Sequence, residues 1–109
     1  MANTFKLKTK ANVGVTTVGI YTAPAATTTV VIGITLANTS GSGVNVGVGI
    51  TRAGTTEDVK LLKNAPIPQG SSLEFMGGNK VVLEATDTVT VDSDPNNSVD
   101  ASLTIMEIT

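Results

Sequence analysis

The sequence predicts an all-β fold: a single antiparallel β-sandwich of about eight or nine strands, either Ig-like or jelly-roll-like. Its commonest residues are Thr, at 18 positions, and Val, at 14, and both are β-branched residues that fit strands better than helices. Short apolar–polar alternations recur between turn residues, and no window of about 11 residues keeps the 3.6-residue period of a helix. At 109 residues the chain is long enough for one domain, over residues 1–109.

The first strands are expected near the N-terminus. In TFKLKTK, Phe5 and Leu7 alternate with three lysines, so one side of this strand is apolar and the other basic. We expect this strand or arm, within residues 1–15, to engage a neighbouring subunit. The next strand, in VTTVGIYTAP, stops at Pro24, which has no amide hydrogen to give to a ladder.

Two strong strand signals follow, in TTTVVIGITLAN and VNVGVGIT. Their alternation predicts eight inward-facing residues: Val30, Ile32, Ile34, Leu36, Val44, Val46, Val48 and Ile50. The segment NTSGSG between them has the composition of a turn, so we expect the two strands to pair as a hairpin.

Five further strands are expected, separated by Pro, Gly and Asn residues: VKLLK (59–63), SSLEFM (71–76), KVVLEA (80–85), DTVTVDS (87–93) and SVDASLTIMEIT (98–109). The break APIPQG follows the first of them, and at most one turn of helix is expected near TTEDVKLL, residues 55–62. At the corner between two of these strands, Asp87 is expected to accept amide hydrogens of its own turn.

The strand VNVGVGIT has almost no side chains on its outer side. Each glycine inside a strand costs about 0.5–1 kcal/mol relative to Ala, so a bare face needs a reason. Either a flat surface docks against another protein without ordering long side chains, or glycine permits strong curvature of the sheet. Both interpretations stay open, and the residues of the predicted interface are Lys6, Lys8, Lys10, Gly33, Thr35, Asn45, Gly47 and Gly49.

Charge is unevenly distributed along the chain. Up to Lys80 there are seven basic and three acidic residues, and beyond it six acidic residues and no basic one. This asymmetry predicts attraction between copies of the chain, unless folding brings the two parts together and cancels it. The net charge of −2 and the 15% of charged residues do not favour a nucleic acid or a membrane as partner.

The residues needed for most catalysis and metal binding are missing. The chain has no His and no Cys, which removes the commonest general base, most nucleophile pairs and the usual zinc ligands. We expect no enzymatic activity, no cofactor and no metal. The carboxylate pairs Asp92/Asp94 and Glu84/Asp87 are predicted to be turn residues rather than acid–base pairs.

DSDPNN, residues 92–97, has alternating oxygen ligands but is not predicted to bind calcium. A calcium loop needs Gly at its sixth and Glu at its twelfth position, and here these are Asn97 and Leu103. Tyr21 and Phe75 are isolated aromatic residues, expected to anchor the core or an interface. The N-terminus MANTFKLKTK lacks the apolar run of a signal peptide, so a soluble, cytoplasmic product is expected.

Two stretches together resemble small virion structural proteins of tailed bacteriophages, cyanophages among them: IYTAPAATTTVVIGITLANTSGSGVNVGVGI and APIPQGSSLEFMGGNKVVLEATDTVTVDSDPNNSVDASLTIMEI. The resemblance covers residues 20–108. It implies a β-sandwich module present in many copies on the particle, most simply a head decoration (cement) protein that binds the major capsid protein. A neck, tail, collar or fibre-adaptor protein is the alternative, and a module that binds host-surface carbohydrate is a third.

The resemblance also implies a homo-oligomer, a trimer or a dimer. The chain would be located in the virion and assembled in the host cytoplasm. It supplies no catalytic residues, and the partners it implies are virion proteins.

Overall fold

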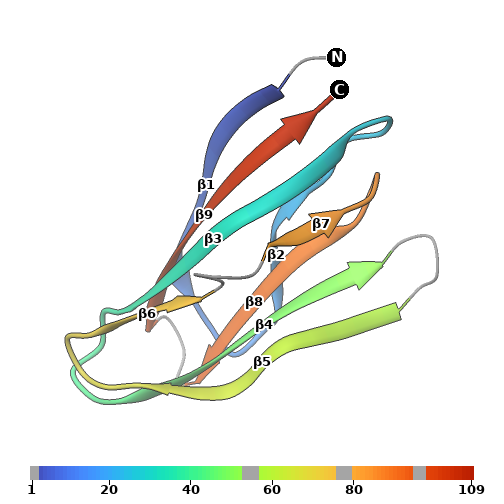
Figure 1. Ribbon diagram of the computed structural model, residues 1–109. Helices are drawn as coiled ribbons and strands as arrows, with labels where there is room; N and C mark the ends of the chain where they lie inside the picture. The colour runs from blue at the N-terminus through green and yellow to red at the C-terminus, as the bar shows by residue number, and fades with distance from the viewer. Residues whose placement is uncertain (1–2, 53–56, 76–79, 95–97) are drawn as a thin grey trace.

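The computed structural model describes residues 3–52, 57–75, 80–94 and 98–109. They form nine strands in two antiparallel sheets (Figure 1), which confirms the predicted all-β sandwich. The strands are β1 (Asn3–Val13), β2 (Val18–Thr22), β3 (Thr28–Asn38), β4 (Val44–Arg52), β5 (Glu57–Ile67), β6 (Ser72–Phe75), β7 (Val81–Leu83), β8 (Thr88–Asp94) and β9 (Val99–Ile108). No helix in the described residues is long and apolar enough to cross a membrane.

The strand order is that of a jelly roll. Sheet A has the order β1-β9-β3-β6, with β7 also paired to β3, and sheet B has the order β2-β8-β4-β5. The pairs β1–β9, β2–β8, β3–β6/β7 and β4–β5 are the rungs of one long antiparallel hairpin. Pairing of β9 with β3 and of β8 with β4 rolls this hairpin into two sheets, which is the jelly-roll arrangement. The Ig-like alternative is therefore not adopted.

The core lies between the sheets and is built almost wholly from aliphatic residues. Alternation along β4 and β9 sends every second residue inward, as predicted. The buried hydrophobic residues of these two strands are Val44, Val46, Val48, Ile50, Val99, Ala101, Leu103 and Ile105. Val89 and Val91 of β8 and Leu83 of β7 complete the same layer. Burial of each large aliphatic side chain contributes about 1.5–3 kcal/mol to folding.

The prediction of which β3 side chains face the core is correct for the C-terminal half of the strand and wrong for the N-terminal half. Ile34 and Leu36 are buried, but at the other end Thr29 and Val31 face inward and Val30 and Ile32 do not. The register against β9 shifts between Val31 and Gly33. One extra residue in a strand reverses the side on which later residues lie, so the inward set changes from odd to even positions at this bulge.

The predicted hairpin of β3 and β4 is also wrong, because the two strands lie in different sheets. Asn38 holds the crossing between them. Its side-chain Nδ2 donates to the carbonyls of Ser42 (2.8 Å) and Ile67 (3.0 Å), and its Oδ1 accepts from the Ser40 amide (2.9 Å). The Ser- and Gly-rich segment therefore bridges the layers of the sandwich instead of reversing the chain within one sheet.

Strand β5 is longer than expected, since it runs on through Pro66 to Ile67. A proline is tolerated here because β5 is the edge strand of sheet B. Two register shifts against β4 bend the strand, and Asn64 takes a left-handed conformation, with φ of 56°. Residues 57–62 thus belong to a strand, whereas at most one turn of helix was expected near residues 55–62. Residues 55 and 56 lie outside the described residues.

Candidate interaction site

The eight residues of the predicted interface lie on three separate parts of the molecule. Gly33 and Thr35 belong to the outer face of sheet A, whereas Asn45, Gly47 and Gly49 belong to the outer face of sheet B. The three lysines, Lys6, Lys8 and Lys10, pair in register with the core residues Ile105, Leu103 and Ala101. They therefore lie on the inner side of the edge strand β1. The eight residues do not form one surface, and their role as an interface stays a prediction.

The inward lysine side of β1 leads to a buried polar cluster. Lys6 Nζ lies 2.9 Å from Glu107 Oε1. The other carboxylate oxygen of Glu107 accepts a 2.6 Å hydrogen bond from the Tyr21 hydroxyl, which also lies 2.8 Å from Thr29 Oγ1. Tyr21, Thr29 and Glu107 are all buried, so Tyr21 is an anchor of the core.

Two pKa values in this cluster move apart. The hydrogen bond from Tyr21, followed by that from Lys6, lowers the pKa of Glu107. Burial, followed by the hydrogen bond to Glu107, raises the pKa of Tyr21 to about 12. At neutral pH the carboxylate is therefore charged and the phenol protonated, which is the combination that this hydrogen bond requires. The cluster fixes β2 against β9 and is a structural element.

Two of the predicted bare positions are covered by the chain itself. A Cβ on Gly47 would lie 2.7 Å from Asp92 Oδ1, and one on Gly49 would lie 2.9 Å from the Val59 carbonyl oxygen. Asp92 is held over Gly47 by Thr17 Oγ1, at 3.1 Å, and by Lys60 Nζ, at 3.7 Å. Close approach of a backbone carbonyl thus explains Gly49, whereas the side chain over Gly47 can rotate away. Gly33 differs, because a Cβ on this residue would meet nothing within 4 Å.

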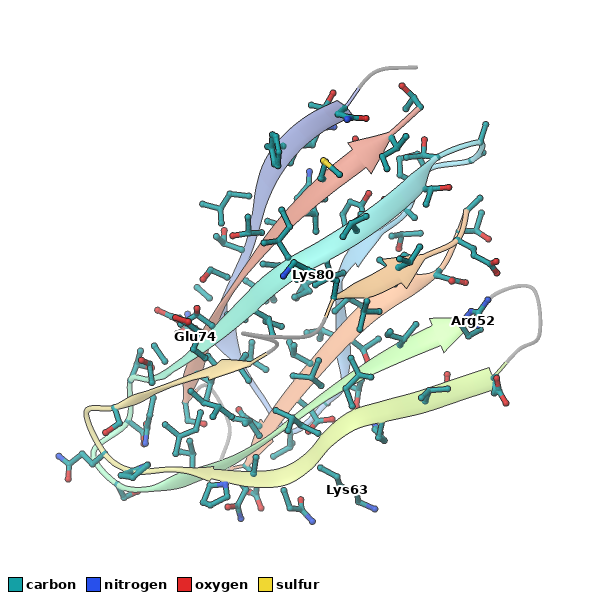
Figure 2. The ribbon with its side chains drawn as sticks, in the orientation of Figure 1. Arg52, Lys63, Glu74 and Lys80 are labelled. Carbon is teal, nitrogen blue, oxygen red and sulfur yellow. The ribbon has the colours of Figure 1, made fainter. Side chains whose placement is uncertain are left out.

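Arg52 lies at the end of β4, as Figure 2 shows. It engages both Asp87 and Glu84, considered above as a carboxylate pair: its Nε lies 2.9 Å from Asp87 Oδ2, and its Nη2 contacts Glu84 Oε1. Asp87 also accepts a hydrogen bond of 3.0 Å from the Glu84 amide, which confirms the predicted turn. The two carboxylates therefore have structural contacts: both bind the Arg52 guanidinium, and Asp87 also stabilises the turn before β8.

The ion pairs cancel part of the charge asymmetry inside the molecule. Among the described residues, each ion pair joins a basic residue of the first 80 to an acidic residue beyond: Lys6–Glu107, Arg52–Glu84, Arg52–Asp87 and Lys60–Asp92. Of the two interpretations of the uneven charge, these contacts support cancellation by folding. Within the described ranges no group of three or more His, Cys, Asp or Glu residues is placed to hold a metal ion, and residues 95–97 of DSDPNN lie outside them.

The outer face of sheet A carries a feature that was not predicted from the sequence. Phe5, Leu7 and Val82 are 69%, 65% and 57% exposed. Strand register places Phe5 beside Met106, Met106 beside Val30, and Val30 beside Val82. We call these five residues the apolar stripe: Phe5, Leu7, Val30, Val82 and Met106. The alternation of Phe5 and Leu7 with lysines was visible in the sequence, but not that the lysines face inward.

Beside the apolar stripe, the same face is hollowed. A depression of about 290 Å³ lies over β1, β9 and β3. Short side chains line it, because Thr9, Ser102 and Thr35 are register neighbours and Ala37 and Asp100 follow in the next row. The full lining is Thr9, Lys10, Ala11, Thr35, Ala37, Asp100, Ala101 and Ser102.

Solved structures share this fold. The chain is similar to a protein of Bacillus endospore appendages, which are disulfide-linked pili (TM-score 0.57, 16% identity, 97% of this chain and 84% of that one). It is also similar to a chain of the infectious bursal disease virus particle (TM-score 0.58, 12% identity, 96% and 30%). A third is the Drosophila NLP core, described with pentamer formation and histone binding (TM-score 0.58, 12% identity, 97% and 99%).

These likenesses concern the fold. This chain spans less than a third of the virus particle chain that it matches. No protein-family model matches the sequence, and no curated protein matches it.

Proposed function

We propose that this chain is a structural subunit of a virus particle, and specifically a capsid decoration protein that binds and stabilises the lattice of the major capsid protein. The observation that carries the proposal is the jelly-roll strand order of this chain, whose fold is similar to that of a chain of an icosahedral virus particle. It occurs here in a sequence that resembles tailed-phage virion proteins over residues 20–108.

The physical properties of the molecule fit this role. The two sheets offer broad outer faces, and the carboxylates nearest to an acid–base arrangement are held in ion pairs and turns. A subunit that bridges neighbouring capsid proteins stabilises the shell by the surface it buries, and a specific contact of this kind buries about 1,200–2,000 Å². Repetition over the lattice multiplies a modest affinity.

The copy number in purified particles tests the proposal. Quantitative mass spectrometry of particles that contain this chain should find hundreds of copies each. A dozen copies or fewer would contradict decoration and support the alternative of a neck, tail, collar or fibre-adaptor protein. Removal of the protein from particles should lower the temperature at which the shell releases its genome, and undecorated shells of equal stability would contradict a cementing role.

The alternative of carbohydrate binding loses one of its two aromatic candidates. Tyr21 is 7% exposed and its hydroxyl contacts Glu107 and Thr29, so its ring is not presented to a sugar. The side chain of Phe75 lies outside the described residues. Tight binding to capsids with no signal on a glycan array is the outcome that the decoration proposal predicts.

A further inference from the structure

The outer face of sheet A is divided along its strands into a raised half and a hollow half. Two residues after Thr104 along β9, the row of Phe5, Met106 and Val30 belongs to the apolar stripe. Two residues before Thr104, the row of Thr9, Ser102 and Thr35 lines the depression. The row between them pairs Leu7, Thr104 and Gly33. Raised and hollow parts therefore lie at equal distances on either side of this middle row.

This division makes the face complementary to itself. If a second copy is turned over about an axis along the Leu7–Thr104–Gly33 row, its strands run antiparallel to those of the first copy. Phe5 and Met106 of each copy then meet Thr9 and Ser102 of the other. A two-fold arrangement of this kind uses the same patch on both copies, as closed dimers do.

The sizes of the two halves agree. The depression of about 290 Å³ exceeds the ~150 Å³ of an apolar cavity that admits benzene, so it can accept the Phe5 ring. The face spans four strand positions of about ten residues, or roughly 33 by 19 Å from standard strand spacings. Two such faces bury about 1,200 Å², which reaches the lower limit of a stable, specific interface.

Charge is compatible with this packing. Glu74 and Lys80 lie on the β6–β7 side of the same face (Figure 2), and Glu74 pairs in register with Thr35, in the hollow half. When one copy is turned over, its Glu74 lies near Val82 of the other copy, and Val82 is two residues from Lys80. A negative and a positive side chain therefore lie near each other along the β6–β7 side of the interface. Asp100, at the end of the depression, lies opposite the Ile108 end of the other copy.

Addition of a second copy edge to edge at β1 is a poorer arrangement. Lys6, Lys8 and Lys10 lie on the inner side of this edge strand, and inward-pointing lysines are a common device that keeps sheet edges from pairing. The exposed apolar side chains of sheet A, such as Phe5 and Leu7, lie on its outer face and not on the inner side of this edge strand.

From these observations we propose that two copies of this chain form a two-fold dimer through the outer faces of sheet A, with Phe5, Met106 and Val30 of each copy packed over the depression of the other. The inference does not depend on the proposed function, because it concerns the isolated protein. It leaves sheet B, with Asn45, facing away from the dimer.

Sedimentation of the full chain, from micromolar to millimolar concentration, tests the dimer. The wild type should dimerise. Leu7→Lys places like charges on the axis and should weaken dimerisation by at least about 30-fold, as loss of a central contact does. Ala37→Gln fills the depression and should also weaken it, whereas the matched control Asn45→Lys, on sheet B, should not. Circular dichroism confirms that each variant is folded.

Cross-linking tests the axis itself in a chain that has no native cysteine. Facing sheets lie about 10 Å apart, so a short bismaleimide should join two copies of Thr104→Cys rapidly and two copies of Asn45→Cys slowly. The proposal would be overturned by a wild type that stays monomeric at millimolar concentration or that forms a trimer. It would also be overturned if Asn45→Lys but not Leu7→Lys dissociated the dimer, or if both cysteine variants were cross-linked equally fast.

Discussion

At the scale of single residues, glycines that look alike in the sequence have different reasons to be glycine. A methyl group on Gly49 would meet a backbone carbonyl, that of Val59, at 2.9 Å, whereas one on Gly33 meets nothing within 4 Å. We expect Gly49→Ala to lower the free energy of unfolding by about 1–3 kcal/mol, as overpacking does. Gly33→Ala should leave it unchanged or raise it by about 0.5–1 kcal/mol. Urea unfolding followed by circular dichroism measures both.

Gly47→Ala is the internal control for this comparison. Its new methyl group would meet the end of the Asp92 side chain, which can rotate away, so its cost should fall between those of the other two variants. Equal effects at Gly33 and Gly49 would show that curvature of the sheet, and not close approach of neighbouring atoms, requires the glycines of both strands.

The polar cluster around Glu107 predicts a stability limit on each side of neutral pH. Because the pKa of Glu107 is lowered from 4.5, its contribution is complete above pH 4.5 and is lost as the pH falls through the folded-state pKa. Because the pKa of Tyr21 is raised from 10.0 to about 12, its contribution is complete below pH 10 and is lost between pH 10 and about 12.

Two conservative variants assign these limits, measured as the free energy of unfolding against pH. Glu107→Gln should reduce the acid-side slope, and Tyr21→Phe should reduce the alkaline-side slope. At neutral pH Tyr21→Phe should cost about 1–3 kcal/mol, because it leaves a buried carboxylate oxygen without its donor. Unchanged slopes in both variants would mean that other groups set the limits.

At the scale of strands, alternation predicts most where a strand is regular and pairs on both sides. The inward residues of β4, β8 and β9 follow directly from their period of two. The same rule fails in β3, because a bulge near Ile32 depends on how β9 pairs with it. It also fails to show that β3 and β4 belong to different sheets, since a turn within one sheet and a crossing between two sheets use the same Ser and Gly residues.

The crossing between the sheets should depend on Asn38. Asn38→Ala removes two donated and two accepted hydrogen bonds and leaves the buried Ile67 carbonyl without this donor. We expect a loss of about 2–3 kcal/mol in the free energy of unfolding by urea. Asn45→Ala, at an exposed asparagine of β4, is the matched control and should change it by less than about 0.5 kcal/mol. A similar effect at both positions would remove the special role of the crossing.

At the scale of the whole molecule, the sequence predicts the fold class better than it predicts which residues share a surface. The all-β class and the position of Asp87 in a turn follow from residue types. The interface residues are scattered because facing depends on which strands pair, and Gly33 and Gly47 come from opposite layers. For the same reason the exposed position of Phe5 could not be foreseen, since it requires that the lysines of β1 face the core side.

The pairing of β1 with β9 brings the two ends of the chain together, and the last prediction concerns this pairing. Asn3 and Ile108 are register partners, so their Cα atoms lie about 5 Å apart and a short linker can join the two ends (Figure 1). A circular permutant that is joined there and opened in the exposed turn between Gln69 and Gly70 should fold with the same strand content, as permuted domains opened at such turns do. Circular dichroism and urea unfolding measure the outcome. If β1 instead belonged to a neighbouring subunit, as an exchanged N-terminal arm, the short linker would prevent the exchange, and the permutant would lose its cooperative unfolding or its native association.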